Sequence, residues 1–226
     1  MPVIPSSTRP WTAGKTLTLD PNHVGQIGMY KLLISGVVPR PIALLSTCSP
    51  DGVANLAPFS FFNAVSSNPP CLSVSITRKS NGDKKDSLRN IEATKQFVVN
   101  VTPSWIAEKM NQTSAEYPYG VSEFSESGLT PLKSSQVSPP RVAESPLAFE
   151  CELLEKLEIG DGSQGSTTLV IGKILAVQVD ENAIRDGKLL LEKLDPLSRL
   201  GGMNYGLTRQ TFEIDRPALP KDKPST

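Results

Sequence analysis

The sequence has a single histidine, His23, among 226 residues. One histidine cannot build a multi-histidine metal site, and a serine–histidine–aspartate triad would have to use His23 itself. His23 lies just before a helical pattern that runs from Val24 to Leu33, where a surface or capping role is expected. The scarcity of histidine therefore weighs against hydrolases and metalloenzymes, and we assign no metal site and no catalytic side chain.

Cysteine is also scarce. Cys48, Cys71 and Cys151 are far apart and lie in apolar runs, a pattern that favours buried reduced thiols over a disulfide or a metal site. The first fourteen residues contain three prolines but neither the apolar core nor the basic start of a signal peptide, and we expect an extended arm there. No apolar run is long enough to span a membrane. The cytoplasm is therefore the expected location.

The chain has no excess of either charge, because 23 Lys and Arg residues balance 23 Asp and Glu residues. This balance argues against a nucleic acid or a membrane surface as partner. The P-loop pattern G-x-x-x-x-G-K-[ST] does not occur, which excludes one common nucleotide site. The letters of the Rossmann pattern G-x-G-x-x-G occur once, at 160–165, but in a turn-rich loop between two predicted strands rather than at the start of a helix, so they do not indicate a dinucleotide site. The length suits one domain with a real core, and the twenty prolines indicate many fixed turns.

The informative part of the chain begins with three strands between residues 38 and 77. Ile42–Cys48 is a strand-length apolar run, and the Ser-Pro-Asp-Gly turn after it predicts a hairpin. Val53–Phe59 contains Pro58, so it should be an edge strand or bend there. Ser60–Asn63 is expected to leave that strand. Cys71–Thr77 alternates apolar and hydroxyl side chains with a period of two.

Two long strands return the chain to the predicted sheet. They are Ala148–Ile159 and Thr167–Val179, the second with a bend at Gly172. About six strands support a small barrel, in which closure removes the sheet edges. Thr211–Ile214 could add a last strand.

Helices and loops are predicted between these strands. We expect helices over 88–94 and 103–110, and a short helix with a turn at 186–187 within 180–195. Residues 111–146 are rich in Ser, Pro and Glu, and a loop of that length is either an excursion packed on the barrel or a lid over the site.

A basic loop leads into the helix at 88–94. Arg78, Lys79, Lys84 and Lys85 surround Gly82, and Asp86-Ser87 can cap the helix. Positive charge beside the unpaired amides of a helix N-terminus is a plausible seat for a phosphate group. The alternative is a solvated turn, and spacing alone leaves the two readings open.

Four ordered segments carry a resemblance to a known family. They are PRPIALLST at 39–47, NLAPFSFFNAVSSNPP at 55–70, KKDSLRNI at 84–91 with FVVN at 97–100, and RLGGMNY at 199–205. Together they resemble the flavin reductase-like family. The resemblance implies a mainly β fold, an FMN-binding split β-barrel of about six antiparallel Greek-key strands with a few flanking helices. It covers residues 28–216, between an N-terminal arm and short helix at 1–27 and a tail at 217–226.

The resemblance also implies which residues bind the cofactor. The phosphate and ribityl chain would lie against the strand-to-helix junction, at Arg78, Lys79, Lys85, Asp86 and Ser87, with Asp86 as a helix cap rather than a direct ligand. The ring would lie near Ser46, Thr47, Ser60, Phe61, Phe62, Asn63 and Ala64, and the segment with Tyr205 close to it. From residue type alone, Phe61 and Phe62 could be core aromatics, Asn63 a strand end, and residues 199–205 an ordinary loop.

The implied function is that of an FMN-binding flavoprotein oxidoreductase. The simplest form is a flavin reductase that takes hydride from NADH or NADPH onto the flavin, with FMN expected rather than FAD. One alternative is a flavoredoxin-like electron carrier that serves a protein partner, and another is a non-enzymatic flavin-binding protein. A partner monooxygenase is implied for some members, as is a homodimer with the cofactor near the subunit interface. No segment identifies a nicotinamide pocket.

Overall fold

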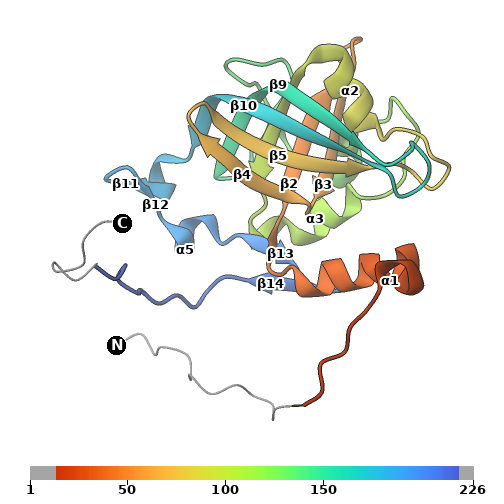
Figure 1. The fold of residues 1–226 in the computed structure, drawn as a ribbon. Coiled ribbons are helices and arrows are strands. Elements are labelled where there is room, and N and C mark those ends of the chain that lie inside the picture. The colour runs from red at the N-terminus through yellow and green to blue at the C-terminus, as the bar shows by residue number, and fades with distance from the viewer. Residues whose placement is uncertain (1–13, 219–226) are drawn as a thin grey trace.

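The computed structural model describes residues 14–218. The fold is mainly β, with 37% strand and 22% helix, and forms the expected split barrel (Figure 1). Seven antiparallel strands follow the order β3-β2-β6-β9-β10-β5-β4 in one curled sheet. Their bounds are β2 Ala43–Cys48, β3 Ala54–Phe59, β4 Phe62–Ser67, β5 Pro70–Thr77, β6 Gln96–Val101, β9 Leu147–Ile159 and β10 Thr167–Val179. The arm and tail predicted at the two ends lie almost wholly outside the described residues.

The predicted first hairpin is confirmed. β2 is buried along its whole length, and the turn after it closes through a hydrogen bond from the Gly52 amide to the Ser49 carbonyl, with Gly52 at φ 86°. β3 lies at an edge of the sheet, as expected for a strand that contains Pro58. Its other side faces β5, so the two ends of the curled sheet approach each other around a closed core.

The chain leaves β3 after Phe59, as expected, but the strand that follows was not predicted. This strand is β4, which pairs with β5 from Phe62 opposite Val74 to Ser67 opposite Pro70. β4 is mostly exposed, so it lacks the apolar alternation that marks a half-buried strand. Thr211–Ile214 forms no strand. The last strand is β14 (Tyr205–Leu207), in a small sheet with β1 (Arg40–Pro41) and β13 (Leu197–Arg199).

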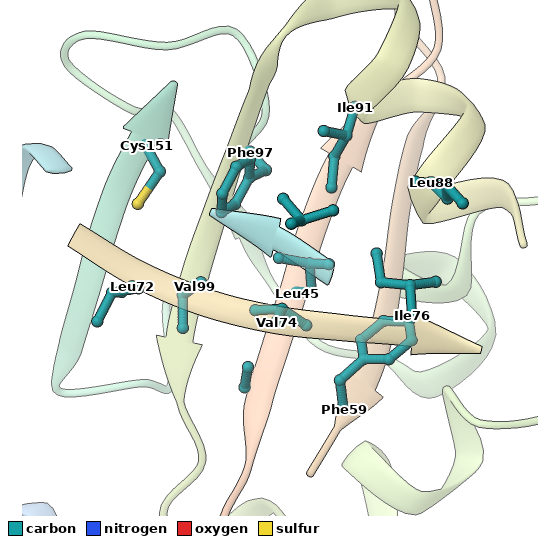
Figure 2. Packing of buried hydrophobic residues seen from close by; sticks show 12 residues of the cluster. Leu45, Phe59, Leu72, Val74, Ile76, Leu88, Ile91, Phe97, Val99 and Cys151 are labelled. Carbon is teal, nitrogen blue, oxygen red and sulfur yellow. The ribbon is translucent and has the colours of Figure 1, made fainter. Parts of the chain in front are cut away.

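The core fills the inside of the barrel, where side chains from six strands and α2 (Asp86–Thr94) meet (Figure 2). Phe97 lies at its centre and is 1% exposed. A bulge falls between Ile171 and Gly172 of β10, and the missing side chain of Gly172 leaves room for the Phe97 ring. The bend predicted at Gly172 is therefore confirmed. A second apolar cluster covers the outer face of β2, beneath α3 (Ala107–Gln112) and α4 (Glu123–Ser127).

The predicted helices form with shifted ends. The 103–110 pattern becomes a short 3-10 turn, Ser104–Ile106, followed by α3. α1 spans Pro21–Gly36 with a break at Gly25, longer than the predicted pattern, so the boundary predicted at residue 27 falls inside it. It runs below the barrel in Figure 1, beside β14. Within residues 14–218, no helix combines the length and the apolar character that a membrane crossing requires.

The long segment at 111–146 is packed on the barrel. It contains α4 and the short strand pair β7 (Pro131–Leu132) and β8 (Arg141–Val142). The buried Glu150 carboxylate on β9 accepts hydrogen bonds from the Ser135 and Gln136 amides. The 180–195 segment contains a 3-10 turn at Glu181–Ala183, strands β11 (Ile184–Arg185) and β12 (Lys188–Leu189), and α5 (Leu191–Leu194), with the predicted turn at Asp186-Gly187.

Candidate functional site

A hollow of about 240 Å³ opens at one end of the barrel. One wall comes from β3 and the turn after it, a second from β5, and a third from the start of α2. The loop residues Thr113–Tyr117 lie opposite, and Tyr30 of α1 and Glu123 of α4 complete the lining. Segments far apart in the sequence therefore meet around this one space.

The start of α2 gives the hollow an anion-binding character. The helix begins at Asp86, and Lys85 occupies the N-cap position with an extended backbone and no side-chain cap. The amides of the first turn are therefore left uncapped, and they carry the positive end of the helix dipole. The expectation that Asp86 caps the helix is wrong, since its carboxylate accepts a hydrogen bond from Lys79 at 3.1 Å.

The four cations of the basic loop separate into two groups. Lys79 and Lys85 line the hollow, whereas Arg78 pairs with Glu158 and Lys84 pairs with Glu92. Among residues 14–218, no carboxylate lies within ion-pair distance of Lys85. Because Lys79 is already paired with Asp86, Lys85 brings the unneutralised positive charge to this hollow.

Ser87 lies beside Lys85, and a residue from β3 holds it in place. The Asn55 side chain donates a hydrogen bond from Nδ2 to Ser87 Oγ at 3.0 Å, and both residues are buried in the wall. Asn55 is absent from the predicted site. The signal in the sequence that could have identified Asn55 was a polar side chain on an otherwise apolar edge strand.

The segment predicted to face the ring divides between two hollows. Ser60 and Phe61 line the first, and Phe61 remains 38% exposed, which does not fit a core aromatic. Phe62 and Asn63 lie on β4 and line a second hollow of about 450 Å³, which shares Ser60 and Phe61 with the first. Ala64 is exposed and lines neither hollow.

Ser46, Thr47 and Tyr205 lie outside both hollows, as Ala64 and Arg78 do. Ser46 and Thr47 are fully buried on β2, and Thr47 Oγ1 accepts a hydrogen bond from Asn90 on α2. Tyr205 lies on β14, where its hydroxyl donates to Asn111 Oδ1 at 3.1 Å and Arg199 stacks over its ring. The structure therefore does not bring their side chains to the hollow.

Sequence reasoning missed a carboxyl group in the hollow. Glu123 is 6% exposed, and its Oε2 accepts the Leu56 amide at 2.8 Å. Burial raises the pKa of Glu123, and the nearby Asp86 raises it further, against the hydrogen bond from Leu56. Nothing in the sequence links α4 to β3, because the two are more than sixty positions apart.

The donor set suits a phosphate ester joined to a flat apolar group. Lys85, the uncapped amides and the Ser87 hydroxyl offer charge-assisted hydrogen bonds to a phosphate. The wall from Ala57 to Phe61 offers apolar surface and a ring for stacking. FMN contains both groups, a phosphate ester and a flat ring system.

Comparisons with known proteins identify the family to which the chain is similar. Residues 35–196 match the family described as flavin reductase like domain. An uncharacterised protein of Halalkalibacterium halodurans is 37% identical over 208 residues, 92% of this chain and all of the relative. Nitrilotriacetate monooxygenase component B from Bacillus cereus superposes with a TM-score of 0.85 at 35% identity, covering 89% of this chain and all of that one. The 2-nitrobenzoate 2-nitroreductase of Pseudomonas fluorescens gives a TM-score of 0.77 at 29% identity, covering 92% and 99%.

Proposed function

The chain belongs to the flavin reductase-like domain family, and we propose from this that it is an oxidoreductase that binds FMN in the hollow at the start of α2 and reduces it with NADH or NADPH. One observation carries the proposal: Lys85, which has no acidic partner in the described part of the chain, stands at an uncapped helix N-terminus inside a hollow whose other wall is apolar. That combination suits a single ligand that contains both a phosphate and a ring.

Each part of the hollow has a role in the proposal. Lys85, Ser87 and the first-turn amides of α2 bind the phosphate, and Asn55 fixes the Ser87 hydroxyl through its hydrogen bond. Ser60 and Phe61 bind and orient the ring end, and the Thr113–Tyr117 loop limits access of water. Bound FMN would supply the hydride chemistry, so no side chain of this protein has to transfer hydride.

The proposal extends to the surroundings of the site. We place the protein in the cytoplasm, where thiols stay reduced, because its three cysteines are free and buried. The likeness to a monooxygenase component supports a partner oxygenase that would use reduced flavin. A homodimer is supported by apolar side chains exposed on α1.

Exchange of the phosphate-binding groups tests the site. Lys85→Ala with Ser87→Ala should weaken FMN binding by a few kcal/mol, because each charge-assisted contact contributes about 1.5–3 kcal/mol. Flavin fluorescence titration measures this, with riboflavin as a ligand that lacks the phosphate and should lose far less. Lys84→Ala is the matched control, since Lys84 pairs with Glu92 outside the hollow. Unchanged FMN affinity in the folded double variant would remove the phosphate assignment.

Anaerobic mixing with NADH and with NADPH tests the reaction. Bleaching of the flavin absorbance by either nucleotide is the expected result. A flavin that stays oxidised with both but accepts electrons from a reduced protein would identify an electron carrier. A protein that binds no flavin at all would exclude both functions.

A further inference from the structure

Arg40, the centre of the Pro-Arg-Pro motif, is a buried cation that the proposed function does not use. Its side chain lies on β1 and the residue is 5% exposed. The guanidinium donates to the Ile34 and Val37 carbonyls at the end of α1, to the Leu200 carbonyl, and at a longer 3.4 Å to Ser60 Oγ. All four acceptors are uncharged.

The charge of Arg40 is therefore not neutralised by a neighbour. Among residues 14–218, no carboxylate lies within 4 Å of it. Its partner across the β1–β13 pair is Arg199, a second cation. Burial, and then Arg199, lower the pKa of Arg40, yet a guanidinium stays protonated at neutral pH. Carbonyl groups at the end of a helix favour a cation, which explains how this one tolerates burial.

The position of Arg40 places this charge directly behind the wall of the FMN hollow. Ser60, which its Nε approaches, lines that hollow. Arg40 itself lines the second hollow, together with Ser60 and Phe61. The Ser60 side chain therefore links the Arg40 charge to the hollow proposed for the ring, in an interior where charges interact more strongly than in water.

We propose that Arg40 is a positioning residue that stabilises the reduced flavin through its unneutralised charge without contacting it. This inference rests on the proposed function. Hydride brings two electrons and one proton to the neutral oxidised ring, so the product ring has one more negative charge, which a proton from water neutralises below neutral pH. The positive charge of Arg40 behind the wall of the hollow therefore stabilises the anionic reduced flavin more than the neutral oxidised flavin.

The test compares binding of oxidised and reduced FMN to the full-length protein at pH 8 without oxygen. Arg40→Met should weaken binding of reduced FMN roughly tenfold more than that of oxidised FMN. For a two-electron couple this ratio lowers the midpoint potential of the bound flavin by about 30 mV. Arg40→Lys keeps the charge and should keep most of the potential. Arg209→Met is the control, because Arg209 is exposed and already paired with Asp195.

A second pair of variants leaves Arg40 in place, in case Arg40→Met does not fold. Val37 is 59% exposed, and its carbonyl accepts from Arg40. Val37→Glu adds a carboxylate beside the cation and should lower the potential relative to the uncharged Val37→Gln. Equal potentials in both comparisons, or an equal loss in Arg40→Lys and Arg40→Met, would overturn the inference. If the wild-type protein binds no flavin, the proposed function itself fails.

Discussion

Gly172 shows how closely the barrel interior is packed at the residue scale. A Cβ built there would lie 2.2 Å from Cζ of Phe97, which has no space to move into. Gly172→Ala should therefore destabilise the protein by about 1–3 kcal/mol through overpacking. Urea unfolding measures this. Gly36→Ala is the control, since nothing lies within 4 Å of its added Cβ, and it should change stability little. Equal unfolding midpoints for the two variants would contradict the packing argument.

The Glu123 carboxyl makes a pH-dependent contribution to stability. Burial raises the pKa of Glu123 above its unfolded value, so the folded state holds its proton more tightly. Stability should therefore fall as pH rises from about 4.5 through that raised pKa. Glu123→Gln can still accept the Leu56 amide but has no charge to bury. Its urea midpoint should fall less than that of the wild type between pH 5 and pH 8, and parallel profiles would contradict the assignment.

Some single residues could be predicted and others could not. The basic loop before α2 is readable because cations followed by a helix start form a local pattern, and Lys85 indeed lines the hollow. Local patterns do not show which cations have acidic partners. The pairing of Arg78 with Glu158 could therefore not be predicted from the sequence. β2 is buried on both faces, so alternation could not tell which way Ser46 and Thr47 point.

At the scale of elements, Glu150 fixes the long 111–146 segment to the barrel. Burial by itself would raise the pKa of Glu150, but hydrogen bonds from Ser135, Gln136 and Gln178 outweigh it and lower the pKa. The stability it contributes should be present above pH 4.5 and be lost as pH falls through the lowered pKa. Glu150→Gln should speed proteolysis of this segment at pH 7. Glu155→Gln, an exposed substitution on the same strand, should leave the cleavage rate unchanged.

Elements with one buried face were the predictable ones. β5, β9 and β10 alternate because one face meets the core, and their bounds lie within a residue or so of the prediction. β4 carries no such pattern, and its hydrogen bonds to β5 rather than burial make it a strand. Residues 113–117 and α4 reach the hollow through long-range packing. Local sequence patterns cannot predict such packing.

At the scale of the whole molecule, α1 presents apolar side chains to solvent. Ile27 is 73% exposed, Leu33 is exposed on the same helix, and Val37 is exposed just after the helix ends. We expect two chains to cover these side chains, giving a particle of twice 24.4 kDa in light scattering after gel filtration. Ile27→Glu should shift the mass toward one chain, whereas His23→Glu, an equal charge on the same helix, should not. A wild-type mass of one chain at micromolar concentration would contradict the expectation.

The three buried cysteines can report how often individual strands detach from the core. Cys48, Cys71 and Cys151 belong to β2, β5 and β9, which lie in different parts of the sheet, and all three thiols are free. An alkylating reagent can reach each one only when its strand detaches from the core. Mass spectrometry of peptides after timed exposure would therefore rank the strands by how often each detaches, with no label or substitution introduced.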